Sequence, residues 1–181
     1  MAKTPRYSIT GLPPFRGANL KRRGLTAARR IRRGRGVDLA AVVALLKSCG
    51  LPTADLAHAP DLHVWVFEEN DTVFGAIGMQ RFGACALLRS LAVGAGHQRR
   101  GFGRQLVARL EREAEVQGVE QLVLLTESAE GLFRAAGYEV IDRRFVPEKI
   151  KQSAEFQSLC PASAVCMKKL LASSCTEVPH G

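Results

Sequence analysis

The chain has 181 residues, 46% of them hydrophobic, which is sufficient for one domain with a hydrophobic core. No run of 18 apolar residues occurs, so neither a membrane-spanning helix nor a membrane partner is expected. The net charge of +9 is uneven, because eleven of the 26 basic residues lie within residues 1–36, which contain no Asp or Glu. The rest of the chain contains 15 basic and 17 acidic residues. Nucleic acid is therefore expected to bind at most loosely, through the N-terminal segment.

The composition divides the chain into a basic head, one domain and a polar tail. We expect residues 1–29 to be disordered, residues 30–171 to form the domain and residues 172–181 to fray. The Arg-rich head also resembles an organellar transit segment, so a cytoplasmic location is expected with an organellar one as the alternative. Reduced thiols and no metal site are predicted, because the histidines are scattered and no CxxC pair occurs among Cys49, Cys85, Cys160, Cys166 and Cys175.

The first half of the domain predicts one helix and up to four strands. A segment around Ile31 can supply a first strand, and Asp38 is expected to cap a helix over 39–49, whose apolar residues form one stripe. Alternating apolar residues around a polar turn then predict a hairpin, on which Glu68 and Glu69 are expected to be solvated. The next segment is almost wholly apolar and predicts a central strand. These three strands are predicted over 62–70, 72–82 and 84–93.

The second half of the domain alternates helices and strands. An amphipathic helix is predicted over 103–117, with Leu106, Val107 and Leu110 facing inward. The elements predicted after it are a strand over 121–126, a helix over 129–136, a strand over 138–142, a helical segment over 147–156 and a strand over 163–171. Helices interleaved with strands in this order predict an α/β (α+β) fold with a mixed sheet.

The turn GAGHQRRGFG (94–103) joins the predicted central strand to the amphipathic helix. Free backbone N–H groups at a helix N-terminus bind anions, and the helix dipole adds to this effect. Glycine at Gly101 and Gly103 permits the close approach of a phosphate, while Arg99, Arg100 and Arg104 add positive charge. The turn therefore predicts a pyrophosphate site, although it matches neither the P-loop nor the dinucleotide fingerprint.

The segment Gln98-Arg99-Arg100-Gly101-Phe102-Gly103 resembles the acetyl-CoA motif of the Gcn5-related N-acetyltransferases, the GNAT superfamily. The flanking stretches LRSLAV, LVARLEREAEVQG and LFRAAGY are similar to that family as well. Within it, LLRSLAV, VLLTESAEGLFRAAGYEVIDR and AEFQSLCPASAVCM resemble the arsenic-resistance-associated N-acetyltransferases. The resemblance covers residues 30–171 and implies the GNAT fold, a twisted sheet of six or seven strands that is splayed at the acetyl-CoA site.

The resemblance also implies acetyl-CoA as the co-substrate, without a metal. In the family the pantetheine lies along the backbone of the strand before the motif, and the pyrophosphate lies on the N–H groups of the motif. Thr126 occupies a position where many relatives carry an Asn that contacts the cofactor. The implied cofactor-binding residues are Leu91, Ala92, Val93, Gln98, Arg99, Arg100, Gly101, Phe102, Gly103, Arg104 and Thr126.

The catalytic candidates are less sharply defined. Many relatives carry a tyrosine general acid four residues before the Gly of a Gly-aromatic pair, and here that position is Phe133. Tyr138 is the substitute candidate or a core aromatic. Glu127 is expected either to collect the proton of the amine through water or to be a first-turn acid of the next helix. Arg89 is expected to bind either a substrate carboxylate or a structural one such as Asp142.

The resemblance implies an acetyl-CoA-dependent N-acetyltransferase (EC 2.3.1.-) acting on a small, amino-acid-like amine, such as a phosphinothricin- or arsinothricin-type toxin. A GNAT-fold acyl-CoA-binding protein without efficient turnover is the alternative, since Phe133 cannot donate a proton. A monomer or a homodimer is expected. Cys160, in the polar turn SLCPAS, is expected to pack or to line the substrate site rather than to act as a nucleophile.

Overall fold

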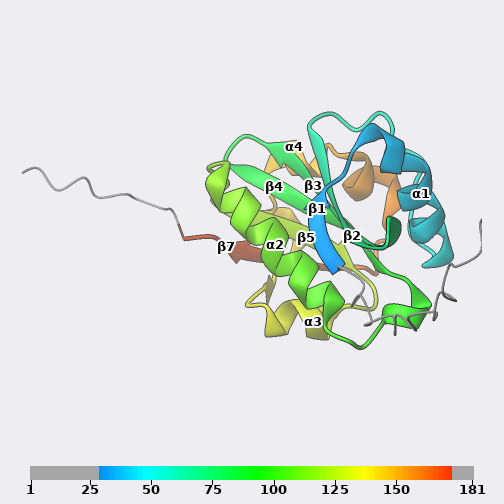
Figure 1. Cartoon of the computed structure of the whole chain (residues 1–181). Helices are drawn as coiled ribbons and strands as arrows, with labels where there is room; N and C mark the ends of the chain where they lie inside the picture. The colour runs from blue at the N-terminus through cyan, green and yellow to red at the C-terminus, as the bar shows by residue number, and fades with distance from the viewer. Residues whose placement is uncertain (1–28, 173–181) are drawn as a thin grey trace, which may run out of the picture.

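The computed structural model describes residues 29–172. Its centre is a seven-stranded sheet in the order β1-β2-β3-β4-β5-β7-β6, antiparallel except for the parallel pair β4 and β5 (Figure 1). The predicted mixed sheet is confirmed. The expected head and tail lie outside the described residues, except for Arg29 and Ala172. The strands are β1 (Arg29–Arg33), β2 (Leu62–Glu69), β3 (Thr72–Phe82), β4 (Cys85–Val93), β5 (Gln121–Thr126), β6 (Glu139–Val140) and β7 (Val165–Leu170).

Helices cover both faces of the sheet. The α2 helix lies across one face, where its apolar stripe packs with Trp65 and Ile77 and where Phe133 of α3 joins the same cluster (Figure 1). The opposite face is covered by α1, packed on Val66 and Ala76, and by the residues around α4. The α-helices are α1 (Leu39–Ser48), α2 (Phe102–Val116), α3 (Glu130–Ala135) and α4 (Glu148–Lys151); the shorter turns are η1 (Gly36–Asp38), η2 (Ala95–His97), η3 (Arg143–Phe145) and η4 (Glu155–Leu159).

The first strand is held to the sheet by a network of ion pairs that corrects two predictions. Glu68 is not solvated but buried, and its carboxylate accepts hydrogen bonds from Arg30 and Arg32 at 2.5 and 2.6 Å. Asp38 does not cap α1 with its side chain; it accepts from Arg32 at 2.6 and 2.9 Å and from the backbone N–H of Arg35. These arginines hold the pKa values of both carboxyls below their usual range.

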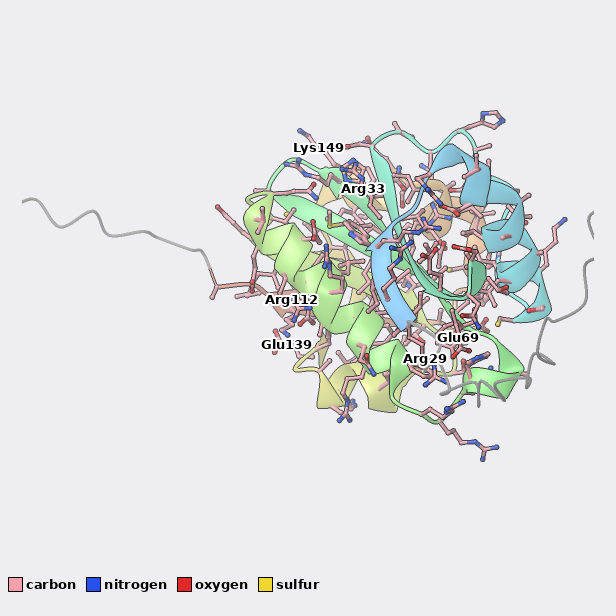
Figure 2. The ribbon with its side chains drawn as sticks, viewed as in Figure 1. Arg29, Arg33, Glu69, Arg112, Glu139 and Lys149 are labelled. Atoms are coloured by element: carbon pink, nitrogen blue, oxygen red, sulfur yellow. The ribbon has the colours of Figure 1, made fainter. Side chains whose placement is uncertain are left out.

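A further ion pair closes the end of this edge of the sheet. Arg29 donates to Glu69 at 2.6 Å, and Figure 2 shows the two side chains near the end of β1. Glu69 keeps partial exposure, whereas Ile31 between the arginines packs on the core of the α2 face. The strand expected around Ile31 is therefore confirmed, and it begins one residue before the expected boundary of the domain.

The C-terminal third departs most from the predicted elements. The segment predicted as one helix over 147–156 contains only the single turn of α4, and η4, which follows, is a π-helical turn. The strand predicted over 138–142 contains only β6, because Tyr138 is buried in the core and Asp142 caps the next turn by accepting from the backbone N–H of Arg144. The last strand is shorter than predicted by two residues at its start and one at its end.

Candidate functional site

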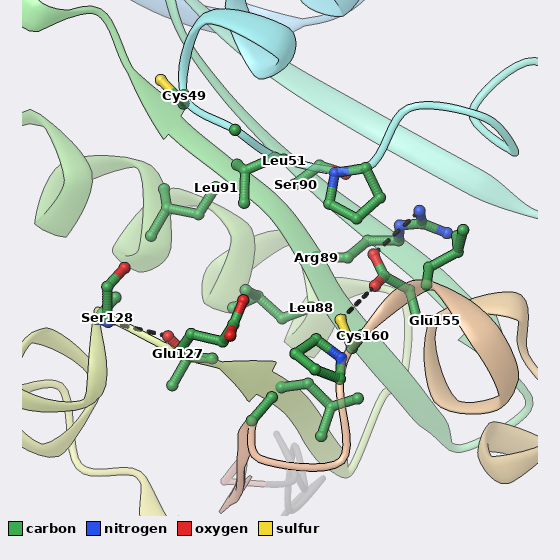
Figure 3. Close-up of a pocket in the computed structure, with 18 of the residues that line it drawn as sticks. Cys49, Leu51, Leu88, Arg89, Ser90, Leu91, Glu127, Ser128, Glu155 and Cys160 are labelled. Atoms are coloured by element: carbon green, nitrogen blue, oxygen red, sulfur yellow. Dashed lines mark hydrogen bonds and ion pairs between the residues drawn. The ribbon is translucent and has the colours of Figure 1, made fainter.

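The sheet opens between its two parallel strands. β4 and β5 pair only over Cys85–Leu87 and Gln121–Val123, and beyond these residues the two strands diverge. A cavity of about 210 Å³ lies in the gap, lined by the second half of β4, the end of β5, the segment 49–52 and the segment 155–161 (Figure 3). The backbone of β4 is unpaired on this side, so its N–H and C=O groups are available to an extended ligand. The splayed sheet implied by the family resemblance is present.

A β-bulge in β4 shapes the wall of this cavity. Ala76 pairs with Ala92 and Gly78 pairs with Arg89, so a single residue of β3 faces both Ser90 and Leu91. Ser90 has a φ of 57°, a left-handed conformation that non-glycine residues rarely adopt. Such strain costs about 1–3 kcal/mol and is concentrated at functional sites. Ser90 lines the cavity, and its hydroxyl oxygen is buried without a hydrogen-bond partner.

The predicted anion site is formed at the N-terminus of α2. Gly101 is the N-cap residue with a φ of 81°, and no side chain caps the helix. The first backbone bond of the helix runs from Gln105 N–H to Gly101 C=O, so the N–H groups of Phe102, Gly103 and Arg104 have no partner within the helix. A Cβ built on Gly101 would meet no atom within 4 Å, so the space beside this N-cap residue is open. This arrangement fits a phosphate group.

Side chains around this turn divide into exposed arginines and a buried aromatic. Arg99, Arg100 and Arg104 are exposed, and Arg99 has a φ of 58°. Phe102 is buried among the aromatic side chains of β2 and β3, with its ring centroid 5.0 Å from that of Phe67, so only its backbone is available to a cofactor. Gly103 also has a packing role, because a Cβ there would lie 3.2 Å from Leu132 Cδ1.

The other predicted cofactor residues occupy different positions relative to the cavity. Leu91 and Thr126 line it. Ala92 is buried in the α1 cluster, so its side chain faces away from α2. Gln98 donates from Nε2 to the carbonyl of Val93 at 2.9 Å, which ties the loop to the end of β4. The side chain of Gln98 and the backbone carbonyl of Val93 therefore organise the turn, and the rest of the unpaired β4 backbone remains for a ligand.

Glu127 lies at the mouth of the cavity, just after β5. It is exposed and lines the cavity, and Figure 3 shows its carboxylate projecting inward. It is not a first-turn acid, because α3 begins at Glu130 and Glu130 takes that place. Thr126 is already engaged locally, since its Oγ1 accepts a hydrogen bond from the backbone N–H of Ala129 at 3.0 Å.

Arg89 is paired inside the fold. Its side chain is 1% exposed and donates to Asp55 through both terminal nitrogens, at 2.5 and 2.7 Å, and it pairs with Glu155 at 3.0 Å (Figure 3). The alternative of a structural carboxylate is therefore the one observed, but with Asp55 and Glu155 rather than Asp142. These contacts link β4 to the two segments that contain Asp55 and Glu155.

Cys160 completes this cluster. Its Sγ donates to Glu155 Oε2 at 2.9 Å, and burial together with this carboxylate raises the pKa of the thiol to about 12. Cys160 is thus a thiol near neutral pH and a poor nucleophile, in agreement with its predicted position lining the site. The cysteines of the described residues are all free thiols.

Tyr138 does not reach the cavity, which corrects its selection as a catalytic candidate. It is 3% exposed, packs edge-on against Phe133 at 5.4 Å between ring centroids, and its hydroxyl has no hydrogen-bond partner. Burial and the nearby Glu111 raise the pKa of the phenol above its usual value. Phe133, at the position where relatives carry tyrosine, does line the cavity.

Sequence reasoning missed Asp55 and Glu155. Both contact Arg89 from segments distant in the sequence, and neither lies in a regular apolar pattern, although Glu155 belongs to the stretch AEFQSLCPASAVCM. A charged residue inside an apolar strand, as at Arg89, is the one signal that a buried partner exists. Within residues 29–172 no group of His, Cys, Asp or Glu side chains could hold a metal ion, and none of the helices there is long and apolar enough to cross a membrane.

Comparison with known proteins finds similarity to acetyltransferases. Residues 60–140 match the family model of the acetyltransferase (GNAT) domain. An alignment over 96 positions, which covers 48% of this chain, shows 31% identity to an uncharacterized N-acetyltransferase of Chlorobaculum tepidum and spans 59% of the length of that protein.

Two solved structures share the fold. One is N-acetylglutamate synthase from Neisseria gonorrhoeae complexed with coenzyme A and N-acetyl-glutamate, with a TM-score of 0.67 and 19% identity over 81% of this chain and 36% of that one. The other is a Mycobacterium tuberculosis protein in complex with CoA, with a TM-score of 0.66 and 22% identity over 79% of this chain and 99% of that one. The chain therefore has the GNAT fold, with a GNAT acetyltransferase domain matched over residues 60–140.

Proposed function

We propose that this protein transfers the acetyl group of acetyl-CoA to a small primary amine. The observation that carries the proposal is the parting of β4 and β5 beside an uncapped, arginine-rich helix N-terminus. An unpaired strand backbone and a cluster of free N–H groups suit the two halves of a CoA molecule, its amide-bearing pantetheine and its pyrophosphate. The matched GNAT domain and the fold-sharing proteins solved with CoA support the same proposal.

Different segments of the chain would bind different parts of the cofactor. The N–H groups of Phe102, Gly103 and Arg104 would bind the pyrophosphate, and Arg99 and Arg100 would lie at its rim. The free edge of β4 would hydrogen-bond the pantetheine. The bound cofactor supplies an activated acyl carbon and a thiol leaving group.

Transfer also requires the amine to lose a proton before its nitrogen attacks the acyl carbon. Glu127 is the exposed carboxylate at the cavity mouth, and in this proposal it collects that proton through water. No acid is needed for the leaving group, because a thiol with a pKa near 8.5 departs readily near neutral pH. The apolar Phe133 at the cavity wall is consistent with this.

Phe133 also favours a second function, acyl-CoA binding without efficient turnover. The cavity wall there has a buried phenyl ring where relatives carry a proton donor. A protein of this second kind would bind acetyl-CoA but would release no thiol with any amine.

The acceptor is proposed only as a small amine. The family resemblance implies an amino-acid-like acceptor such as phosphinothricin or arsinothricin, whose acidic groups require cationic partners. Among the described residues that line the cavity, the one Lys or Arg is Arg89, and Asp55 and Glu155 already hold its terminal nitrogens. Amino-acid-like toxins therefore enter the test as one arm of a panel.

Two measurements on the full chain test the proposal. Acetyl-CoA is expected to raise the melting temperature by mass action, and free thiol is expected to appear when amines are added. The panel consists of alkyl amines, diamines, free amino acids and phosphinothricin. A melting temperature unmoved by acetyl-CoA would refute the cofactor site, whereas a shift without thiol release from any acceptor would favour the second function.

A further inference from the structure

The cavity has a second end, on the side of the sheet opposite α2. Leu91 packs with the α2 cluster, whereas Cys49 belongs with the α1 cluster and Glu155 follows α4, which packs on the α1 side. The gap between β4 and β5 joins the two sides. If the cofactor enters beside the N-terminus of α2, the acceptor amine meets the residues at this second end, which are Arg89, Glu155 and Cys160.

Arg89 has no free pair of donors to offer a substrate. One terminal nitrogen donates to Asp55 at 2.5 Å and approaches Gln80 at 3.5 Å, and the other serves Asp55 at 2.7 Å and Glu155 at 3.0 Å. Its Nε has no hydrogen-bond partner and is buried. Recognition of a carboxylate by arginine relies on a fork of two parallel N–H donors. In Arg89 both terminal nitrogens are already bound to carboxylates of the chain itself, those of Asp55 and Glu155.

Glu155, in contrast, still has hydrogen-bond acceptor capacity to offer a substrate. Its side chain lines the cavity and is 9% exposed; Oε1 forms an ion pair with Arg89, and Oε2 accepts a hydrogen bond from Cys160. A carboxylate offers about four lone-pair positions, so acceptor capacity remains on both oxygens. Ser90 lines the same cavity, although its hydroxyl oxygen is buried without a partner.

The charges at this end favour a cation. Two carboxylates, from Asp55 and Glu155, share one guanidinium, and Glu127 adds a third carboxylate at the mouth. Arg143 is a second cation near Cys160, but it does not line the cavity; it donates to the carbonyls of Pro161 and Ala164. The charged side chains that do line the cavity are one guanidinium, of Arg89, and two carboxylates, of Glu127 and Glu155. A buried carboxylate that is only partly compensated gains from a cationic partner.

From this geometry we infer that the acceptor is a primary amine with no carboxylate beside its amino group, and that Glu155 binds its ammonium. This inference rests on the proposed function and narrows it to one class of substrate. Glu155 is thus a specificity-determining residue. Arg89 is a positioning residue, which fixes the Glu155 carboxylate on the cavity wall.

The first test compares amines with their amino-acid counterparts on the unmodified full chain. The pairs are isoamylamine with leucine and 1,4-diaminobutane with ornithine, measured by thiol release from acetyl-CoA. We expect kcat/KM to be at least about tenfold higher for the decarboxylated member of each pair, because the carboxylate of the amino acid would be brought close to the carboxylate of Glu155. A preference for leucine and ornithine would overturn the inference and leave the proposed acetyl transfer intact.

The second test compares two variants that each remove one carboxylate from Arg89. Glu155→Gln is expected to lower kcat/KM for isoamylamine about ten- to a hundredfold and to reduce its advantage over leucine. Asp55→Asn changes the charge beside the same guanidinium but does not line the cavity. It is expected to leave the ratio of isoamylamine to leucine unchanged.

Three outcomes separate the inference from the broader proposal. Equal losses for isoamylamine and leucine in Glu155→Gln, with an unchanged ratio, would show that Glu155 is structural and would overturn the inference. If Glu155→Gln does not fold, as judged by far-ultraviolet circular dichroism, the substrate pairs on the unmodified chain decide the question alone. No thiol release with any member of either pair, despite acetyl-CoA binding, would instead refute acetyl transfer.

Discussion

The N-cap residue of α2 offers a sharp test of the cofactor site, because the chain carries a matched control at the other end of the same helix. Gly101 and Gly118 have φ values of 81° and 72°, both are exposed, and a Cβ on either would meet no atom within 4 Å. Replacing either glycine by alanine therefore forces a left-handed alanine without a clash within the chain. The strain is about 1–2 kcal/mol per residue, which lowers the melting temperature of a chain this size by roughly 2–8 °C.

The two variants are expected to differ only when acetyl-CoA is present. At a concentration of about 100 times Kd, the ligand stabilises the unmodified protein by about 2.7 kcal/mol, or roughly 5–11 °C. Gly101→Ala adds a methyl group at the N-cap residue, next to the free N–H groups of the first turn. If this methyl group weakens acetyl-CoA binding about a hundredfold, the ligand stabilises the variant by only about 0.4 kcal/mol, and the rise in melting temperature falls to roughly 1–2 °C.

Differential scanning fluorimetry of the unmodified chain, Gly101→Ala and Gly118→Ala, each with and without acetyl-CoA, measures both effects. Gly118→Ala is expected to melt lower than the unmodified chain and to keep the full ligand shift. Equal ligand shifts in the two variants would show that acetyl-CoA does not use the N-terminus of α2, and the phosphate-site reasoning would then be refuted.

Three other changes probe the remaining features. Phe133→Tyr is expected to alter kcat by less than about tenfold, and a gain on the order of a hundredfold, the usual contribution of a positioned acid, would show that the leaving thiol needs one. Arg89→Lys is expected to cost roughly 1.5–3 kcal/mol in urea unfolding, because an ammonium cannot make the two-pronged contact with Asp55; unchanged stability would contradict its structural pairing. Glu68 and Asp38 have lowered pKa values in the folded state, so their stabilisation is present above their unfolded pKa values and is lost on acidification through the folded ones. Glu68→Gln should therefore reduce the loss of unfolding free energy between pH 6 and pH 3.5, and an identical loss in the variant would contradict this.

The helices and strands that were predicted correctly are those whose signals lie within one segment of the sequence. The helix over 103–117 was displaced by one residue from α2, because its amphipathic stripe and its flanking glycines are signals within one segment. The hairpin and the strand β5 followed from alternation and apolar runs in the same way. The segment after Pro147 has neither a sustained period nor a cap, and the single predicted helix was wrong there.

Long-range ion pairs were beyond the reach of these patterns. Glu68 sits beside a polar turn, where solvation is the ordinary expectation, but the arginines of β1 approach it from 36 and 38 residues away. Asp38 precedes a helix and has the residue type of a cap, yet its carboxylate binds the guanidinium of Arg32 and does not cap α1. In both cases an arginine on the edge strand determines where the acidic side chain points; it is far from Glu68 in the sequence but only six residues from Asp38.

The bulge at Ser90 explains why the cofactor residues and the acceptor residues can come from one short strand. In regular alternation, residues 89, 91 and 93 share one face of a strand. Here the extra residue resets the alternation, so that Leu91 and Val93 pack with the α2 cluster while Arg89 faces Asp55 and Glu155 on the other side. A β-bulge bends the strand that contains it, and the pairing of β4 with β5 ends shortly before Ser90. One strained residue thus separates the two sides of the site and lies where the strands part between them, so a ligand on the α2 side and an amine held by Glu155 can meet in the gap.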